Sequence, residues 1–263
     1  MDVRADSHLH SHHSFDSQAP LADQCRAALS RGLGEVCFTE HFSLDPLAPT
    51  YGHMDWAAYR REFEACREAF EGRLAVYWGV EVCEPHLLAP AYAALFSRLP
   101  LDGVLGSVHN VGHRKLRRLV QEEGPDRAAA LYFGEVLAMV EGGRMEVAAH
   151  LDLVKRYMGA PLAPAQLAAN RPVLEAILRR VVQRGLALEV NTSTLEKLGE
   201  PMPSPWILRL YRQLGGWRIT LGSDAHQPER VGQGLAAAAA LARELGFPGV
   251  CICRGRQLVF HPF

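Results

Sequence analysis

Seven short apolar segments alternate along this chain with longer segments that have the periodicity of amphipathic helices. The apolar segments are rich in Val, Ile, Leu and Phe, and most of the helical segments are followed by a glycine, which is favoured where a helix ends. This alternation is typical of a parallel sheet whose strands are joined by crossover helices. No linker or break in composition divides the chain, so we expect one α/β domain over residues 1–263.

The predicted elements follow from this alternation. The seven predicted strands cover residues 3–5, 35–39, 74–80, 103–108, 145–149, 186–190 and 217–222. The seven predicted helices cover residues 20–31, 55–70, 88–98, 126–141, 164–184, 205–214 and 229–245. Pro20, Pro164 and Pro205 fit the first turn of a helix, where a proline is tolerated.

A polar or charged residue follows nearly every predicted strand. In chain order these residues are His8, His10, His41, Glu81, His109, His150, Asn191, Asp224 and His226. In a closed or nearly closed barrel of parallel strands, the carboxyl ends of all strands meet at one rim. A single histidine after a strand is more often a core or loop residue, but the repetition over six strand ends predicts one cluster of metal ligands.

The composition limits the partners of the protein. The formal net charge is −1 and the pI is about 6.9, so the chain has no basic footprint of the kind that binds nucleic acid. The most basic run, residues 113–118, is typical of a solvated helix face. The six cysteines form no C-x-x-C pair and indicate buried free thiols in a reducing compartment.

The sequence also contains no signal-peptide pattern and no apolar run that approaches the ~18 residues of a membrane span. We therefore expect a cytoplasmic protein with no membrane partner and no nucleic-acid partner. The sequence leaves the oligomeric state open.

The strongest local motif is D-x-H-x-H-x-x-x-S-x-D at residues 6–16. His8 and His10 are two residues apart, so on an extended strand their rings project from the same side and can hold one metal. An H-x-H pair alone is a weak signal. Asp6 before it, and Ser14 and Asp16 after it, make the motif specific.

This motif resembles the first motif of the polymerase and histidinol phosphatase (PHP) family. Further matches in family order are the segments at residues 39–41, 79–81, 106–109, 149–154 and 222–226, so the resemblance spans nearly the whole chain. The segments around residues 150, 191–193 and 202–205 are most similar to the stand-alone histidinol-phosphate phosphatases. The resemblance implies a distorted TIM-like (β/α)7 barrel that hydrolyses histidinol phosphate to histidinol and phosphate, in histidine biosynthesis. The partner that it implies is a small phosphorylated substrate.

The resemblance also implies two or three divalent metals at the rim, and the mixed nitrogen and oxygen ligands suit Zn, Mn or Fe. The implied ligands of the first metal are His8, His10, Glu81 and Asp224, and those of the second are the bridging Glu81, His109 and His150. The implied ligands of the third metal are Asp16, His41 and His226. The predicted catalytic residues are Asp6, Glu81, Asp224 and His226, with Asp6 orienting a ligand histidine as a hydrogen-bond acceptor.

The chemistry of phosphate esters gives an independent reason for such a cluster. A phosphate monoester is dianionic and hydrolyses very slowly without help. Two divalent metals about 3.5 to 4 Å apart can share a water, lower its pKa toward about 7 and aim the resulting hydroxide at phosphorus. Because ligand imidazoles must be neutral, we expect activity to fall below about pH 6.

Four basic residues are candidates for binding the outer phosphate oxygens. Lys155 and Arg156 follow the fifth predicted strand, although such a pair could also face solvent. Related phosphatases have Gly-Leu-Arg-Lys where this chain has Thr-Leu-Glu-Lys at 194–197, so the expected arginine is missing. Lys197 and Arg230 are the candidates to replace it, and Glu196 is a candidate partner for a cationic amine of the substrate.

Three other functions stay open at this stage. The basic loop after His109 leaves room for a phosphoesterase that acts on nucleotides or oligonucleotide ends. An amidohydrolase also opens with H-x-H, but Asp16, His41 and Glu81 argue against it, and no lysine ends a predicted strand. A non-catalytic metal-binding module is disfavoured because every implied metal position has a competent ligand.

Overall fold

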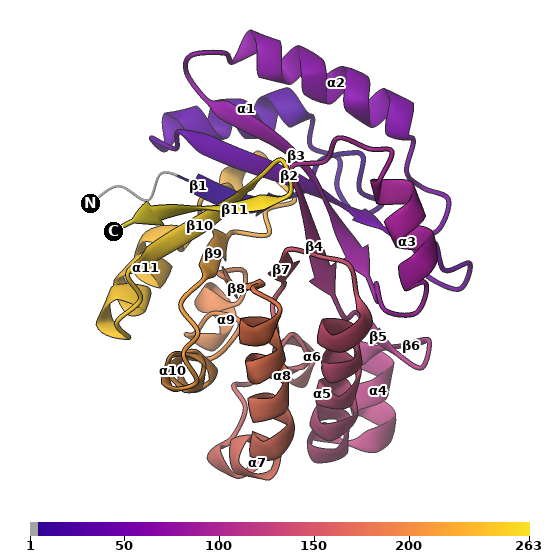
Figure 1. The fold of residues 1–263 in the computed structure, drawn as a ribbon, viewed down its shortest axis with the longest axis vertical. Helices are drawn as coiled ribbons and strands as arrows, with labels where there is room; N and C mark the ends of the chain where they lie inside the picture. The colour runs from indigo at the N-terminus through magenta and orange to yellow at the C-terminus, as the bar shows by residue number, and fades with distance from the viewer. Residues whose placement is uncertain (1–4) are drawn as a thin grey trace.

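The computed structural model describes residues 5–263 and contains seven parallel strands curled into a nearly closed barrel (Figure 1). The strands are neighbours in the order β1-β2-β3-β4-β7-β8-β9. Their bounds are Ala5–Leu9 (β1), Glu35–Phe42 (β2), Ala75–Cys83 (β3), Gly103–Ser107 (β4), Val147–Ala148 (β7), Ala187–Asn191 (β8) and Ile219–Gly222 (β9). The predicted α/β fold, a distorted TIM-like (β/α)7 barrel, is confirmed.

The barrel is closed between its first and last strands at the carboxyl end. Leu9 and Ala225 form a parallel bridge, and the amide of His10 donates to the carbonyl of Ala225 at 2.9 Å. The amide of Asp224 donates to the carbonyl of His8, also at 2.9 Å. The closing contacts therefore join the two segments that carry predicted metal ligands.

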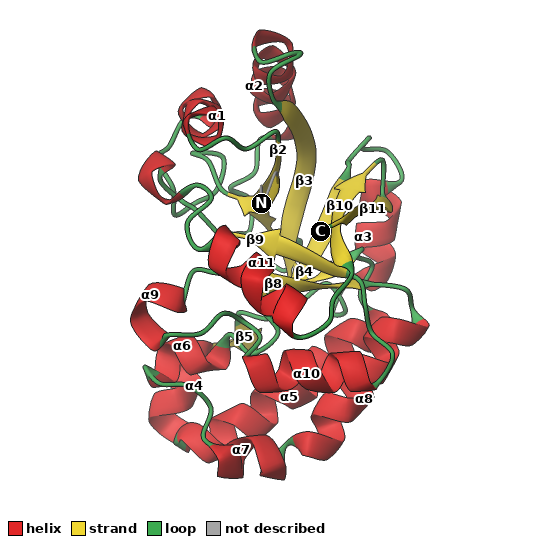
Figure 2. Cartoon of the chain, turned by 90° about the vertical axis from the view of Figure 1, so that its left-hand side faces the viewer, coloured by secondary structure: helices red, strands yellow, loops and turns green. Residues whose placement is uncertain are grey.

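Helices cover the outside of the sheet, with α1 and α2 on one side and a larger group, including α4 to α8 and α10, on another (Figure 2). The helices that match predicted ones are Leu21–Ser30 (α1), Trp56–Ala69 (α2), Ala89–Phe96 (α3), Pro125–Gly142 (α5) and Pro205–Gln213 (α10). The others are Leu116–Glu123 (α4), Val154–Met158 (α6), Pro164–Ala169 (α7), Arg171–Gln183 (α8), Leu195–Leu198 (α9) and Leu235–Glu244 (α11). In the described residues no helix is long and apolar enough to cross a membrane.

Two predicted helices differ from the structure. The helix predicted over 164–184 is broken at Asn170 into α7 and α8, and α8 has a proline in its first turn. The helix predicted over 229–245 begins only at Leu235, after a 3-10 turn at Pro228–Arg230. Gly232 and Gly234 have φ values of 71° and 77°, a left-handed conformation that a continuous helix cannot contain.

Strands β2 and β3 run three residues beyond their predicted ends, so His41 and Glu81 lie within strands and not after them. The two residues are partners in the register between β2 and β3. Cys37 and Tyr77, earlier on the same strands, belong to a small apolar cluster with Ala5 and Ile252. Side chains two residues apart on a strand point to the same face. His41 therefore points into the barrel like Cys37, and Glu81 like Tyr77, so the inward-facing side chains are apolar in the middle of these strands and polar at the rim.

The first strand also differs from its prediction over residues 3–5, of which only Ala5 lies within the described residues. Strand β1 continues to Leu9, and its register shifts between Asp6 and Leu9. Ala5 contacts the barrel interior, whereas Leu9 belongs to the large core between the sheet and the helices. Residues two apart on a regular strand face the same side, but a bulge changes the direction of the side chains that follow it. Asp6 and His8 therefore face different sides of β1.

The amino end of the barrel is filled by a hairpin that the sequence did not predict. Its strands are β10 (Gly249–Arg254) and β11 (Gln257–Pro262). Ile252 packs against the first three strands, and Cys253 packs against Leu105 and Val147. All six cysteines are free and buried, as predicted. A smaller hairpin of Asn110–Val111 (β5) and Arg114–Lys115 (β6) lies near the opposite end.

Replacing Gly222 with alanine is expected to lower the free energy of unfolding by about 1 to 3 kcal/mol, because the added methyl overpacks the interior. Its Cβ would lie 2.4 Å from Oε1 of Glu189 and 2.5 Å from Cβ of His8. Urea unfolding of the metal-free protein measures the effect. The control is Gly134→Ala on the exposed face of α5, where nothing lies within 4 Å, and a gain of up to about 1 kcal/mol is expected. Equal effects of the two substitutions would contradict this packing.

Candidate metal centre

Four donor atoms converge at the carboxyl end of the barrel. Nε2 of His8 lies 2.9 Å from Nε2 of His10 and 3.3 Å from Oε2 of Glu81. Nε2 of His10 lies 3.5 Å from the same Glu81 oxygen and 3.4 Å from Oδ1 of Asp224. Donors held 2.0 to 2.2 Å from a tetrahedral metal are about 3.3 to 3.6 Å apart. The four side chains therefore fit a single metal ion.

The second oxygen of Glu81 faces a different pair of histidines. Oε1 lies 2.7 Å from Nε2 of His150 and 3.5 Å from Nε2 of His109. One carboxylate thus offers one oxygen to each of two neighbouring groups of donors. This arrangement is what a carboxylate that bridges two metals requires.

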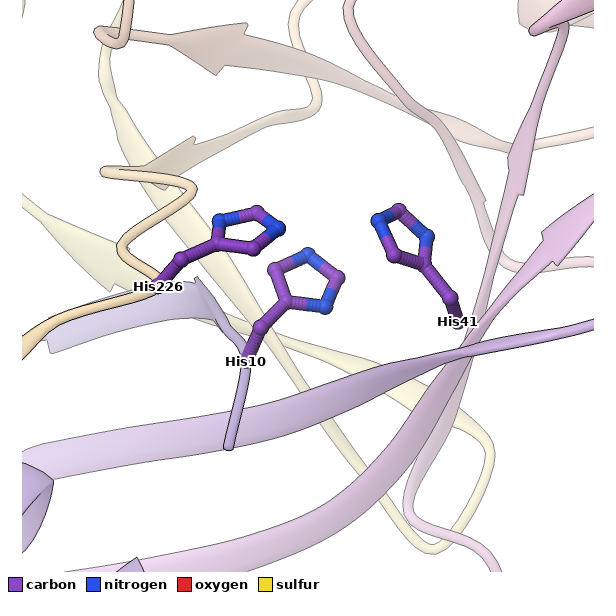
Figure 3. A group of neighbouring side chains, drawn as sticks. All are labelled: His10, His41 and His226. Atoms are coloured by element: carbon purple, nitrogen blue, oxygen red, sulfur yellow. The ribbon is translucent and has the colours of Figure 1, made fainter. Parts of the chain in front are cut away.

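A third group of donors lies beside the first. Oδ2 of Asp16 is 3.4 Å from Nε2 of His41 and 3.4 Å from Nε2 of His226. Figure 3 shows the ring of His10 between the rings of His41 and His226. The ring centroid of His10 lies 4.3 Å from that of His41 and 4.2 Å from that of His226, and both pairs are stacked. The structure therefore brings all nine predicted metal ligands together at one rim.

The carboxylates of this rim stay ionised. Burial alone would raise the pKa of Glu81, but the neighbouring His41 and His109 hold it well below its usual range. Burial also opposes ionisation of Asp224, and His8 and His10 lower its pKa well below the usual range. A buried negative charge needs a compensating positive one, so the rim is suited to cations.

Glu189 contacts two of the predicted ligand histidines and is not among the site residues predicted from the sequence. Its Oε1 lies 2.6 Å from Nδ1 of His8, and its Oε2 accepts a 2.8 Å hydrogen bond from the amide of His150. A carboxylate behind a ligand histidine sets the orientation of the ring. The available signal was an acidic residue between apolar residues of strand β8, two positions before Asn191.

His10 has its own positioning partner. Nδ1 of His10 lies 3.0 Å from Oγ of Ser14, and the hydroxyl of Ser14 donates to Glu40 at 2.6 Å. Glu40 also accepts from the amide and the hydroxyl of Ser11. The serine in the first motif therefore links a ligand histidine to a buried carboxylate on β2.

Asp6 was expected to orient a ligand histidine as a hydrogen-bond acceptor, and its contact with one is a 3.4 Å hydrogen bond that Oδ1 accepts from the backbone amide of His8. Asp6 accepts hydrogen bonds from the amide and hydroxyl of Ser223 at 2.9 and 2.5 Å and from the amide of Gly232 at 2.9 Å. It therefore positions the segment before Asp224, and the ring of His8 is oriented by Glu189 instead. The reason is the bulge in β1, which turns the two side chains to different sides.

Two ligand positions have strained backbones. His150 and Asp224 have φ values of 25° and 57°, and such conformations cost about 1 to 3 kcal/mol each in residues other than glycine. The amide of His150 is held by Glu189, and Nδ2 of Asn191 lies 3.3 Å from Oδ2 of Asp224. Asn191, which follows the sixth predicted strand, thus supports a ligand and is not grouped with the donors.

A cavity of about 420 Å³ opens onto the metal centre. Arg156 lines it, and Nη2 of Arg156 lies 3.0 Å from Oδ2 of Asp224 and donates to the hydroxyl of Ser193. Lys115 and Arg117 also line the cavity and are exposed. Of the four basic residues predicted to bind phosphate, Arg156 is thus the one that lies beside the donor atoms and lines the cavity.

The other predicted substrate-binding residues lie elsewhere. Lys155 is fully buried, and its ammonium contacts Asp152 at 2.9 Å and Glu200 at 2.8 Å, so its charge is used within the fold. Lys197, on α9, and Arg230 are outside the cavity lining. Glu196 was a candidate partner for a substrate amine, and it lies on the surface, 3.5 Å from Arg230.

The basic run at 113–118 was expected to be a solvated helix face, and it forms part of the β5–β6 hairpin and the start of α4. Arg114 and Arg118 match the expectation, because they pair with Glu122 on the surface. Lys115 and Arg117 differ, because they face the cavity. The difference arises because the hairpin bends this run over the barrel rim.

Comparison with known proteins agrees with this fold and site. The model of the PHP domain family matches residues 6–193. A probable histidinol-phosphatase of Thermotoga maritima is 30% identical over 97% of both chains, and one of Deinococcus radiodurans is 31% identical over 92% of this chain and 93% of its own. The crystal structure of the histidinol phosphate phosphatase of Lactococcus lactis, complexed with Zn, L-histidinol and phosphate, superposes with a TM-score of 0.86 at 25% identity and covers 97% of this chain and 98% of that one.

The parallel barrel with imidazoles and carboxylates at its rim defines a metal-binding α/β barrel of the phosphoesterase type. The chain belongs to the PHP domain family, as its motifs indicated.

Replacing Glu189 with glutamine is expected to weaken metal binding by about 10- to 100-fold, because the charge behind the ring of His8 is lost. Competition with a chromophoric chelator measures the affinity. Glu146→Gln is the matched control, since Glu146 accepts from the amide of Val104 and pairs with Arg256 away from the metal centre. Wild-type affinity in the Glu189 variant would exclude the positioning role.

Metal affinity is expected to fall as the pH is lowered, starting above the ordinary histidine range near 6.5. Burial lowers the pKa of His8 and of His41, but Glu189 raises that of His8, and Glu81 raises that of His41, to well above the usual value. Each imidazolium must lose its proton before it binds a metal, so affinity rises until the pH passes these raised pKa values. Equilibrium dialysis across about pH 5 to 9 tests this, and a flat profile would contradict it.

Proposed function

We propose that this chain hydrolyses histidinol phosphate to histidinol and inorganic phosphate. The observation that carries the proposal is the group of nine convergent donor side chains beside Arg156, on a barrel that superposes closely on a histidinol phosphate phosphatase. Two curated relatives that match this chain over more than nine-tenths of its length have the same named activity. The proposed pathway is the synthesis of histidine.

The proposed first metal position consists of His8, His10, Glu81 and Asp224. Glu81 also belongs to the second position, with His109 and His150, and the third consists of Asp16, His41 and His226. Zinc suits these nitrogen and oxygen donors, as do manganese and iron. When bound, the metals supply positive charge for the phosphate oxygens and lower the pKa of a coordinated water.

The residues of the chain have distinct tasks in this proposal. Arg156 presents a guanidinium at the cavity wall and binds outer phosphate oxygens, which a planar donor fork suits. Ser193 and Asp224 hold that guanidinium in place. Glu189 and Ser14 keep the rings of the ligand histidines in orientation. No side chain is required as a covalent nucleophile.

The cavity mouth favours a second candidate function, the hydrolysis of phosphate esters that carry another anionic group, such as nucleotides or oligonucleotide ends. Within the described residues Lys115 and Arg117 have no ion-pair partner, and Arg117 lies 5.9 Å from the ring of Tyr157. The carboxylates that line the cavity are Asp16 and Asp224, both proposed metal ligands. The basic side chains at this mouth therefore repel a cationic substrate amine and attract an anionic group.

A phosphate-release assay on metal-analysed protein distinguishes these functions. The panel contains histidinol phosphate, mononucleotides, nucleosides with two separate phosphates, and sugar phosphates. Release from histidinol phosphate at the highest kcat/KM supports the main proposal, and a preference for the doubly phosphorylated nucleosides supports the second. A full metal complement with no release from any ester would favour a non-catalytic metal-binding module.

Arg156→Met is expected to lower kcat/KM for the preferred ester by roughly 100-fold or more, because a charge-assisted contact worth about 3 kcal/mol is lost. Arg156→Lys restores part of this loss, since it keeps the charge but not the planar fork. Lys197→Met, outside the cavity, is the control and should change kcat/KM little. An unchanged kcat/KM in Arg156→Met would remove this residue from substrate binding.

Removing both mouth charges in Lys115→Ala/Arg117→Ala separates the two candidate substrates. The kcat/KM for a doubly phosphorylated nucleoside should fall by roughly 10-fold or more, because two surface cations each contribute up to about 1 kcal/mol. That for histidinol phosphate should stay the same or rise. Arg114→Ala/Arg118→Ala, on the outer face of the same segment, is the control. A parallel loss for both substrates would show that the mouth does not select by charge.

A further inference from the structure

A second cluster of metal-binding side chains lies outside the barrel rim. Nε2 of His12 lies 3.1 Å, and Nε2 of His13 lies 2.9 Å, from the same oxygen, Oε2 of Glu62. The three donor atoms all lie within 4.8 Å of one another. None of the three residues lines the cavity of the metal centre.

Two parts of the fold hold this cluster in place. The histidines belong to the segment between β1 and α1, where the amide of His12 donates to the carbonyl of Ala19 at 2.9 Å. Glu62 projects from α2, and the ring of His13 lies 5.1 Å from the ring of Tyr59 on the same helix. The side chain of His13 is nearly buried, whereas those of His12 and Glu62 are 39% and 30% exposed. The cluster is therefore ordered on one side and open to solvent on the other.

The cluster differs from the other histidine–carboxylate contacts of the chain. Among the described residues outside the metal centre, four carboxylates contact a histidine, and only one of them contacts two. The five contacts of these four carboxylates are Glu62 with His12 and with His13, Glu135 with His86, Asp45 with His113, and Glu35 with His261. Two imidazoles and one carboxylate are the protein ligands of known zinc sites, whereas one imidazole beside one carboxylate is an ordinary hydrogen-bonded pair.

We propose that His12, His13 and Glu62 form an additional zinc site, separate from the metal centre and independent of its activity. Two imidazole nitrogens and one carboxylate oxygen are ligands that zinc prefers, and water completes the coordination on the open side. The separations of 2.9 and 3.1 Å need to widen by only a few tenths of an ångström to match a tetrahedral edge of about 3.3 Å.

Zinc at this site would tie two elements together. The segment that holds His12 and His13 also carries His10 and Asp16, whereas Glu62 is fixed on α2. A bound ion would link this ligand-bearing segment to the helix and reduce its local opening. Zinc at this site is thus expected to slow hydrogen exchange of the segment and to raise the amount of zinc bound per protein chain.

The test measures bound zinc in protein whose metal centre is already loaded. Wild type, Glu62→Gln and His12→Ala/His13→Ala are each dialysed against the same zinc solution. The metal bound to each protein is then determined by elemental analysis. Wild type should hold one equivalent more than either variant at the same free zinc concentration. Hydrogen exchange of residues 10–20 should slow when zinc is added to wild type and should not respond in the variants.

Glu135→Gln is the matched control, because it neutralises a carboxylate that contacts a single histidine, His86, at 2.8 Å. It should keep the zinc content of wild type. All variants should keep phosphatase turnover and the circular dichroism of wild type, which separates this site from the metal centre. Equal zinc content in wild type and both cluster variants, or an equal loss in Glu135→Gln, would overturn the proposal.

Discussion

The carboxylate of Glu81 is the constraint on which the rim of this barrel depends. It is fully buried, and its two oxygens face two separate groups of donors. A buried carboxylate is tolerated only with compensating partners, and here these are supplied by five histidines from different parts of the chain. They are His8, His10, His41, His109 and His150. The long strand β3, the bulge in β1 and the closure of β1 onto β9 all place side chains around this one group.

The same arrangement explains why positioning groups are so numerous. Each ligand imidazole has a second ring nitrogen, and its partner decides which nitrogen faces the rim. Glu189 contacts Nδ1 of His8, and Ser14 contacts Nδ1 of His10. For His109 the neighbour of Nδ1 is the thiol of Cys83 at 3.2 Å, and burial raises the pKa of that thiol to about 11. The outer partners thus direct the Nε2 atoms of these histidines toward the metal positions.

The grouping of the donor side chains at this rim could be predicted from the sequence because imidazoles and carboxylates have distinctive chemistry and lie at strand ends, which parallel topology brings together. The positioning residues could not, since their partners lie across the barrel. Asp6 was expected to orient a ligand histidine, but next to the bulge in β1 it accepts from Ser223 and Gly232 and contacts His8 only through the backbone amide. Lys155 and Arg156 are adjacent in sequence, yet the short helix α6 turns one into the core and the other into the cavity. The β10–β11 hairpin carried no motif that indicated its place inside the barrel.

The closure of the barrel between β1 and β9 also orders events during synthesis. His8 and Asp224 belong to the same group of donors although 216 residues separate them in the chain. A ribosome releases the histidines first, and they have no complete set of partners until the last strand has emerged. Proteins are made at about 5 to 20 residues per second, so this delay lasts roughly ten to forty seconds. During that interval the nascent histidines lack the carboxylate of Asp224, so this group of donors is completed only when the chain itself is nearly complete.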